Sequence, residues 1–242
     1  MANPCPRLIV ALDVSSATQA QNIVAAVGDA AFCYKVGMQL YTAEGPQVVR
    51  DLVAAGRRVF LDLKYHDIPN TVAAAVAEAA RLGVSMLTVH ASGGAHMLRA
   101  ATAAASSAKP GLLVLGVTVL TSLTDHDLNK LGVTDRVEDQ VVRLAALALA
   151  SGCHGVVAAA REAPRLRTQL QGDFAIVTPG VRPAGTAAGD QARVVTPAEA
   201  IAAGATHIVV GRPITAARDP GAEARAILAE IGSSRTCLPT AG

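Results

Sequence analysis

The sequence of 242 residues contains no tryptophan and few other aromatic residues, three tyrosines and three phenylalanines. Because 51% of the residues are hydrophobic, the core must be built mainly from alanine, valine, leucine and isoleucine. No apolar run approaches the ~18 residues of a membrane span. The longest strand-like run, residues 112–120, is interrupted by Gly116 and Thr118. The first seven residues lack the basic and apolar regions of a signal peptide, so we expect a cytoplasmic protein.

Neither sign of charge predominates, since 21 lysines and arginines stand against 19 aspartates and glutamates. This balance gives no reason to expect a nucleic-acid or membrane surface. Cysteine is scarce, and the four that occur form no CxxC pair; they are Cys5, Cys33, Cys153 and Cys237. We expect free thiols in a reducing cytoplasm and no structural zinc. The histidines show no metal-ligand spacing on one helix face, so no metal site is predicted.

Short β-branched runs alternate with alanine-rich segments along the whole chain. Strands are expected at residues 8–14, 32–38, 58–64, 86–92, 112–120, 155–159, 174–180 and 207–212. Helices are expected near residues 17–27, 45–55, 70–82, 94–107, 138–151, 161–170, 197–203 and 221–231. Continuous apolar strands joined through helices indicate a parallel sheet covered on both sides.

Eight such units predict an α/β protein with a (β/α)8 TIM barrel, which typically needs about 250 residues. A doubly wound sheet is the alternative, but eight β-α units fill the chain with little left over. We therefore expect a single domain over residues 1–242, with residues 1–6 and 233–242 as tails. Helix starts are signalled by Ser15 or Ser16, Asn70, Thr196-Pro197 and Asp219-Pro220. Helix ends are signalled by Gly56, Gly83, Gly152 and Gly204.

The most informative stretch is the polar sequence at residues 62–71, which follows the apolar run 58–61. Residues two apart on a strand point the same way, so Asp62 and Lys64 share a face, with Phe60 one step deeper. Asp67 follows in the loop, close enough to bend back. Charges leave water only when they are paired, so a plain ion pair closing the strand is one interpretation.

The other interpretation of this stretch is catalytic. A Schiff-base lysine must lose its proton, whereas carboxylates beside Lys64 favour its charged form. Lys64 is then suited to donate a proton or to stabilise negative charge as it develops.

Polar residues concentrate where the predicted strands end, the edge at which barrel enzymes carry their active sites. They are Asp13, Lys35, Asp62, Lys64, His90, Thr121, Ser122, the segment 179–183 and the segment 211–213. Several charged strand ends that converge on one mouth predict a ligand. His90 is either a hydrogen-bonding support or a catalyst. Thr121 or Ser122 is suited to hydrogen-bond a carbonyl or an amide of a substrate.

The last two loops indicate a phosphate group on that ligand, because barrels often bind phosphate after strands seven and eight. Gly211 lets the backbone approach closely, and Arg212 supplies a planar fork of donors matched to phosphate oxygens. The segment 182–191 is long and polar and contains two glycines, Gly185 and Gly189, as expected of a closing lid. Taken alone, Arg212 has an ordinary surface arginine as its alternative interpretation.

Residues 60–72, with the sequence FLDLKYHDIPNTV, resemble the signature of the orotidine 5′-phosphate decarboxylase family in its bacterial form. The similarity continues in order and spacing at residues 8–13, 34–37, 88–92, 117–122, 178–191 and 209–213. The resemblance implies a carboxy-lyase that converts orotidine 5′-monophosphate to UMP and CO2, the last step of de novo pyrimidine nucleotide biosynthesis. It also implies a TIM barrel, no metal or organic cofactor, and a homodimer in the cytoplasm.

The resemblance further implies a role for each charged residue. Asp13 and Lys35 would hold the ribose hydroxyls, and Lys35 would also join the charged network. Asp62 would face the departing carboxylate. Lys64 would stabilise the carbanion at C6 of the pyrimidine and protonate it.

Other roles implied by the resemblance concern the partner subunit and the phosphate. Asp67 and Thr71 would reach into the active site of the second subunit, and Thr121 would sit by the pyrimidine. Phosphate binding and lid closure would fall to Arg182, Gln191, Gly211 and Arg212.

Two alternatives remain beside this expectation. The 3-keto-gulonate 6-phosphate decarboxylases share an Asp-x-Lys-x-x-Asp core but use Mg2+. In that group an acidic residue stands where this chain has Lys35, and a lysine there would repel the metal. A non-catalytic nucleotide-binding barrel is the second alternative, and it predicts the loss of at least one member of the charged set.

Overall fold

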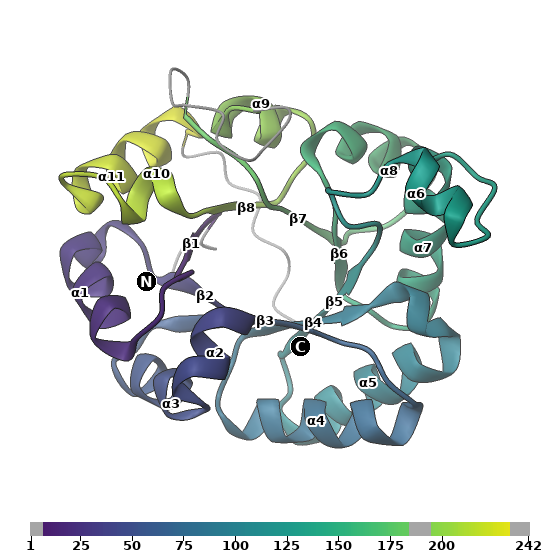
Figure 1. Cartoon of the computed structure of the whole chain (residues 1–242), viewed down its shortest axis with the longest axis horizontal. Coiled ribbons are helices and arrows are strands. Elements are labelled where there is room, and N and C mark those ends of the chain that lie inside the picture. Colours follow the sequence, from purple (N-terminus) through teal and green to yellow (C-terminus); the bar gives the residue numbers. More distant parts are fainter. Residues whose placement is uncertain (1–6, 184–194, 233–242) are drawn as a thin grey trace.

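The computed structural model describes residues 7–183 and 195–232, in which eight parallel strands pair in chain order and close into a barrel (Figure 1). The strands are β1 (Leu8–Ala11), β2 (Cys33–Gly37), β3 (Arg58–Tyr65), β4 (Met86–His90), β5 (Leu113–Val117), β6 (Gly155–Val157), β7 (Ala175–Thr178) and β8 (His207–Val210). β8 pairs with β1, which completes the ring. The predicted (β/α)8 TIM barrel is confirmed. The predicted tails, residues 1–6 and 233–242, lie outside the described residues.

Helices surround the barrel on all sides (Figure 1). They are α1 (Ala17–Val27), α2 (Met38–Glu44), α3 (Gln47–Ala54), α4 (Pro69–Arg81), α5 (Gly94–Ala108), α6 (Asp125–Lys130), α7 (Val137–Ala150), α8 (Ala163–Gln169), α9 (Pro197–Ala202), α10 (Arg212–Thr215) and α11 (Pro220–Glu230). Short 3-10 turns are η1 (Gly28–Ala30), η2 (Ala91–Gly93) and η3 (Ala160–Glu162). In the part of the chain that the structure describes, no helix has the length and apolar character needed to span a bilayer.

Seven of the eight predicted strands run past the C-terminal ends that the structure shows at the barrel mouth; the exception is the prediction for residues 58–64, because β3 continues to Tyr65. The prediction for residues 112–120 corresponds to Leu113–Val117, and Asp13 lies two residues beyond β1 rather than at its end. Apolar and β-branched residues continue past the last paired position, so the sequence pattern alone does not mark where a strand ends. Of the charged residues at the mouth, Asp13 and Arg182 lie in loops beyond the strands, whereas Lys35, Asp62 and Lys64 lie within β2 and β3.

Most of the predicted helix ends are confirmed. The side chains of Ser16, Thr196 and Asp219 accept backbone N–H groups three residues ahead, as N-caps do. The predicted start at Asn70 is wrong, because α4 begins at Pro69, whose ring suits the first helical position. The four glycines predicted at helix ends all have positive φ; they are Gly56, Gly83, Gly152 and Gly204.

The core has two layers, as expected for strands covered on both faces. A small cluster fills the barrel interior, with Ile9, Phe60, Met86 and Leu115 among its members. A larger aliphatic cluster fills the space between the strands and the surrounding helices. Phe60 is 1% exposed, so the barrel interior just below the charged residues of β3 is filled by apolar side chains.

His207, at the start of β8, is buried, and we expect it to make the stability of the fold depend on pH. Burial lowers its pKa from 6.5 to about 4, and the nearby Arg7 and Arg58 act in the same direction. As the pH falls from 6.5 toward 4, His207 is protonated in the unfolded chain but stays neutral in the folded protein, so the free energy of unfolding declines. We expect the free energy of unfolding to lose up to about 3 kcal/mol through this group.

Urea titrations of the wild type and of His207→Asn, between neutral pH and about pH 4, measure this effect. The difference in free energy of unfolding between the two proteins should shrink steadily as the pH falls. The exposed His126→Asn is the matched control and should show a constant difference. A constant difference for His207→Asn would contradict the assignment.

Candidate active site

Four charged side chains of alternating sign form a continuous chain at the mouth of the barrel. Lys35 Nζ lies 2.8 Å from Asp13 Oδ1 and 3.8 Å from Asp62 Oδ2. Lys64 Nζ donates to Asp62 Oδ1 at 2.8 Å. Lys35 and Asp62 are 12% and 13% exposed, while Asp13 at 56% opens to solvent. Each inner charge therefore has an opposite charge as neighbour, which offsets the cost of removing it from water.

The backbone of β3 is irregular where it carries these charges. Between Leu61 and Tyr65 the pairing with β4 loses register. Lys64 has φ +53°, and among the described residues it is the one non-glycine residue with positive φ. A lysine in the left-handed region costs on the order of 1 kcal/mol, and such conformations cluster at functional sites.

The predicted pairing of Asp62 with Lys64 is therefore correct, although a regular strand does not produce it. Period-two alternation placed both side chains on one face, and they do form an ion pair. The bulge turns the Lys64 backbone, and the next residue, Tyr65, packs on the outer side of the barrel wall.

The Lys35 ammonium lies close to the polypeptide backbone at Gly37. A Cβ built on Gly37 would lie 2.9 Å from Lys35 Nζ and 3.3 Å from Asp13 Oδ1. The absence of a side chain at this position therefore makes room for the Lys35 ammonium beside Asp13.

Gly37→Ala is expected to lower kcat/KM on the order of 10- to 100-fold with little change in Tm. The added methyl displaces the end of a flexible lysine, which costs little stability but misplaces its charge. Steady-state kinetics and a thermal melt of the same preparation check this. A variant with unchanged kcat/KM would show that the position of the Lys35 ammonium is unimportant.

A cavity of about 480 Å3 lies beside the charged chain, large enough for a small ligand. Residues at the ends of β1, β2, β3, β7 and β8 line it; among them are Asp13, Lys35, Asp62, Arg182, Gly211 and Arg212. Arg182 is 8% exposed, whereas Arg212 is largely in solvent. The structure thus brings the two predicted phosphate loops to the same cavity as the charged chain. Gln191, the remaining residue predicted for phosphate, lies outside the described residues.

Four described residues of the predicted site do not line this cavity: Lys64, which pairs with the lining residue Asp62, and Asp67, Thr71 and Thr121. Asp67, Thr71 and Thr121 are all exposed. The Asp67 carboxylate accepts the backbone N–H of Ile68 at 2.6 Å. Within one chain, the described carboxylate that pairs with Lys64 is that of Asp62.

His90 ends β4 and lies close to the charged chain, its ring centroid 5.4 Å from that of His66. Burial lowers the pKa of His90, and His66 and Lys64 lower it further. The neutral imidazole is therefore the favoured form at neutral pH. It is suited to hydrogen bonding and not to stabilising a negative charge on a ligand.

Sequence reasoning missed Thr88, whose hydroxyl contacts both Asp62 and the Lys64 backbone. The available signal was its place two residues before His90, on the strand next to β3, so that both point to the same side.

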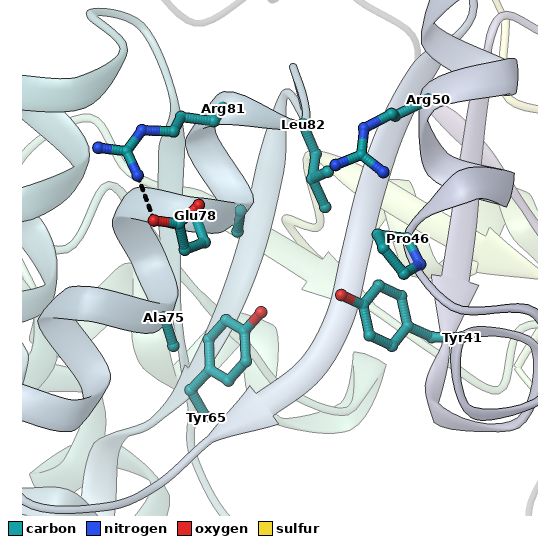
Figure 2. Close-up of a pocket in the computed structure, with 9 residues that line it drawn as sticks. Tyr41, Pro46, Arg50, Tyr65, Ala75, Glu78, Arg81 and Leu82 are labelled. Atoms are coloured by element: carbon teal, nitrogen blue, oxygen red, sulfur yellow. Dashed lines mark hydrogen bonds and ion pairs between the residues drawn. The ribbon is translucent and has the colours of Figure 1, made fainter.

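A second hollow, of about 310 Å3, lies outside the barrel against α2, α3 and α4 (Figure 2). Tyr41 and Tyr65 line it from opposite sides, and Arg81 pairs with Glu78 at its edge. Burial raises the pKa of Tyr65 to about 12, so its hydroxyl stays protonated. This hollow contains none of the four residues of the charged chain, and we assign it no part in the chemistry.

The charged chain offers little to a metal ion. Each of its carboxylates, Asp13 and Asp62, is already paired with a lysine ammonium. Across residues 7–183 and 195–232, no group of three or more His, Cys, Asp or Glu side chains could hold a metal ion.

Comparison with known proteins decides the family. The model of the orotidine 5′-phosphate decarboxylase / HUMPS family matches residues 6–227. The orotidine 5′-phosphate decarboxylase of Halorhodospira halophila is 52% identical over 229 residues, which cover 95% of this chain and 97% of that protein. The chain belongs to this family. Its namesake from Moorella thermoacetica is 51% identical over 231 residues, covering 93% of this chain and 92% of that one.

Solved structures agree with the family assignment. The crystal structure of orotidine 5′-phosphate decarboxylase from Lactobacillus acidophilus superposes with a TM-score of 0.85 at 38% identity, covering 94% of this chain and 100% of that chain. A conserved protein from Geobacillus kaustophilus, described as uncharacterized, gives 0.82 at 36% identity, with 93% and 100% covered.

Proposed function

We propose that the protein decarboxylates orotidine 5′-monophosphate to UMP and CO2, the last step of de novo pyrimidine nucleotide biosynthesis. One observation carries the proposal: the chain Asp13–Lys35–Asp62–Lys64 lies at the barrel mouth of a member of this decarboxylase family. The relatives from Halorhodospira halophila and Moorella thermoacetica, which match more than nine-tenths of this chain, are both named orotidine 5′-phosphate decarboxylase.

The chemistry requires what this chain of charges supplies. When CO2 leaves C6 of the pyrimidine, the electron pair stays on C6 in an sp2 orbital that the ring π-system does not delocalise. Without an electron sink in the substrate, the protein must provide preorganised electrostatic stabilisation. The Lys64 ammonium, held against Asp62, is a fixed positive charge for this purpose. Lys64 then gives a proton to C6, which completes UMP, and regains one from solvent.

We assign the binding of the substrate to two sets of residues. In this proposal Asp13 and Lys35 bind the ribose hydroxyls, and Asp62 faces the departing carboxylate. Arg182, Gly211 and Arg212, which line the same cavity, bind the phosphate, with Gln191 as a further proposed ligand. The free energy of binding the phosphate, far from C6, can be used to close the site and to orient the pyrimidine. We place Thr121 beside the pyrimidine.

We also propose that the protein is a homodimer in which Asp67 and Thr71 complete the partner's site. Both side chains are exposed next to the mouth, and the neighbouring Ile68 is a large apolar residue that is 67% exposed. A carboxylate and an apolar side chain in solvent at the rim are what a shared site needs. Cys33 and Cys153 are buried as thiols, which suits a reducing, cytoplasmic setting.

Mixing two inactive variants tests the shared site. Lys64→Ala and Asp67→Ala should each be inactive as homodimers, but a heterodimer holds one site with both Lys64 and Asp67. We expect activity to return after the two are unfolded and refolded together. Analytical ultracentrifugation of the mixture checks the dimer. A fully active monomer, or no recovery in a verified heterodimer, would rule the shared site out.

The reaction itself is tested by the loss of absorbance of orotidine 5′-monophosphate, with UMP confirmed by chromatography. Conversion in excess EDTA supports the proposal. Conversion that requires added Mg2+ would favour the metal-dependent sugar-phosphate decarboxylases. Lys35 argues against this outcome, because its ammonium would repel a metal ion. No conversion under either condition would leave a non-catalytic phosphate-binding barrel.

A further inference from the structure

Thr88 on β4 is 0% exposed, and its hydroxyl uses both of its hydrogen-bonding capacities on the charged chain. It accepts the backbone N–H of Lys64 at 2.9 Å and lies 3.0 Å from Asp62 Oδ1, to which it donates. An amide can only donate and an ionised carboxylate can only accept, so the direction of both bonds is set.

These bonds close a ring that begins and ends at one residue. Asp62 Oδ1 also accepts the Lys64 ammonium at 2.8 Å. The ring therefore runs from the Lys64 amide through the Thr88 hydroxyl and the Asp62 carboxylate to the Lys64 ammonium. The Lys64 side chain thus bonds the Asp62 carboxylate directly, and the Lys64 backbone is linked to the same carboxylate through the buried Thr88 hydroxyl.

The ring lies at the irregular part of β3. Because register with β4 is lost between Leu61 and Tyr65, three residues of β3 lie opposite one residue of β4, Thr88. Lys64 has its left-handed φ of +53° at this point. A conformation of this kind persists only where the surroundings enforce it. The Thr88 hydroxyl is the side-chain group that bonds the Lys64 amide.

We propose that Thr88 is a positioning residue of the decarboxylation, an inference that rests on the proposed function. Its hydroxyl holds the Lys64 backbone in the left-handed conformation and fixes the Asp62 carboxylate. The Lys64 ammonium is thereby placed for C6 before the substrate arrives. Such preorganisation is needed because a catalytic charge must be held close to its productive geometry.

Thr88→Val keeps the side-chain volume and removes the hydroxyl. We expect kcat to fall about 10- to 100-fold, because a displacement of about 1 Å in a catalytic group can cost about 10²-fold in rate. KM for orotidine 5′-monophosphate and the affinity for UMP should change little, because the phosphate loops are untouched. Thr88→Ser restores the hydroxyl and should recover most of kcat. Valine puts a methyl group where the hydroxyl contacted the carboxylate, whereas alanine leaves that position empty. If Thr88→Val does not fold, Thr88→Ala tests the same point, and we expect the same fall in kcat.

Thr102→Val is the matched control. Thr102 is 9% exposed on α5, and its hydroxyl donates to the backbone oxygen of Ser151 at 3.1 Å. Removing this hydroxyl also deletes a buried hydrogen bond, but in a helix layer away from the charged chain. We expect a lower Tm with kcat unchanged.

A crystal structure of Thr88→Val adds a readout besides activity, in which Lys64 should leave its positive φ or its ammonium should leave Asp62. Wild-type kcat in Thr88→Val, an equal loss of kcat in Thr102→Val, or no recovery in Thr88→Ser would overturn the positioning role while the proposed function stands. A wild-type protein that does not convert orotidine 5′-monophosphate would overturn both.

Discussion

Lys64→Ala is expected to lower kcat for orotidine 5′-monophosphate by at least about 10⁴-fold, a larger loss than we expect from any other single substitution in this protein. Lys64 has two tasks, to stabilise the C6 carbanion and to protonate it, and alanine performs neither. Loss of a preorganised charge partner costs about 10²- to 10³-fold, and loss of a general acid costs a further 10²-fold or more, by order of magnitude. KM should change far less, since the phosphate and ribose contacts remain.

Lys109→Ala is the matched control for this substitution. Lys109 Nζ donates to the backbone oxygens of Gly83 and Val84, at 2.7 and 2.8 Å, beyond the end of α4. Its removal should lower Tm and leave kcat unchanged. Steady-state kinetics and thermal melts of the two variants together separate loss of the catalyst from loss of stability. A kcat for Lys64→Ala within tenfold of the wild type would remove Lys64 from the mechanism.

Arg212→Ala is expected to lower kcat/KM for orotidine 5′-monophosphate on the order of 10²- to 10³-fold. The guanidinium lines the cavity, and charge-assisted bonds to phosphate are among the strongest available to a side chain. Part of the loss should appear in kcat, because the energy of binding a remote group is used to close and orient the site.

Orotidine, which lacks the phosphate, makes this prediction specific. Wild type and Arg212→Ala should convert orotidine at the same low rate, since neither has a phosphate to bind. The exposed Arg218→Ala is the control and should match the wild type with both substrates. Equal turnover of the nucleotide by wild type and Arg212→Ala would refute the phosphate assignment, and a difference with orotidine would indicate a structural role for Arg212.

The barrel and the charged strand ends were predictable because both follow from local patterns. Apolar runs joined through alanine-rich helices determine the order of elements, and charges just beyond an apolar run belong at the rim. The short helices α2, α6 and α10 were missed, since segments of seven, six and four residues are too short to show helical periodicity. The error at Asn70 arose because a good capping residue competes with a proline that is better placed.

The geometry that orients Lys64 was not predictable from local patterns. A bulge is a property of two strands together, and the register of β3 against β4 involves residues far apart in the chain, such as Lys64 and Thr88, whose separation is 24. The positive φ of Lys64 and the part played by Thr88 both follow from that register. By contrast, the pairing of Asp62 with Lys64 was predicted from their spacing of two, although the bulge, not a regular strand, gives it its geometry.

The central claim is most directly tested by proton NMR of orotidine 5′-monophosphate incubated in D2O with the wild type and with Lys64→Ala. The account predicts that wild type produces UMP carrying deuterium at C6, one for each CO2 released, while Lys64→Ala leaves the substrate unchanged over the same time. Unchanged substrate with the wild type, or equally rapid formation of UMP by Lys64→Ala, would contradict it.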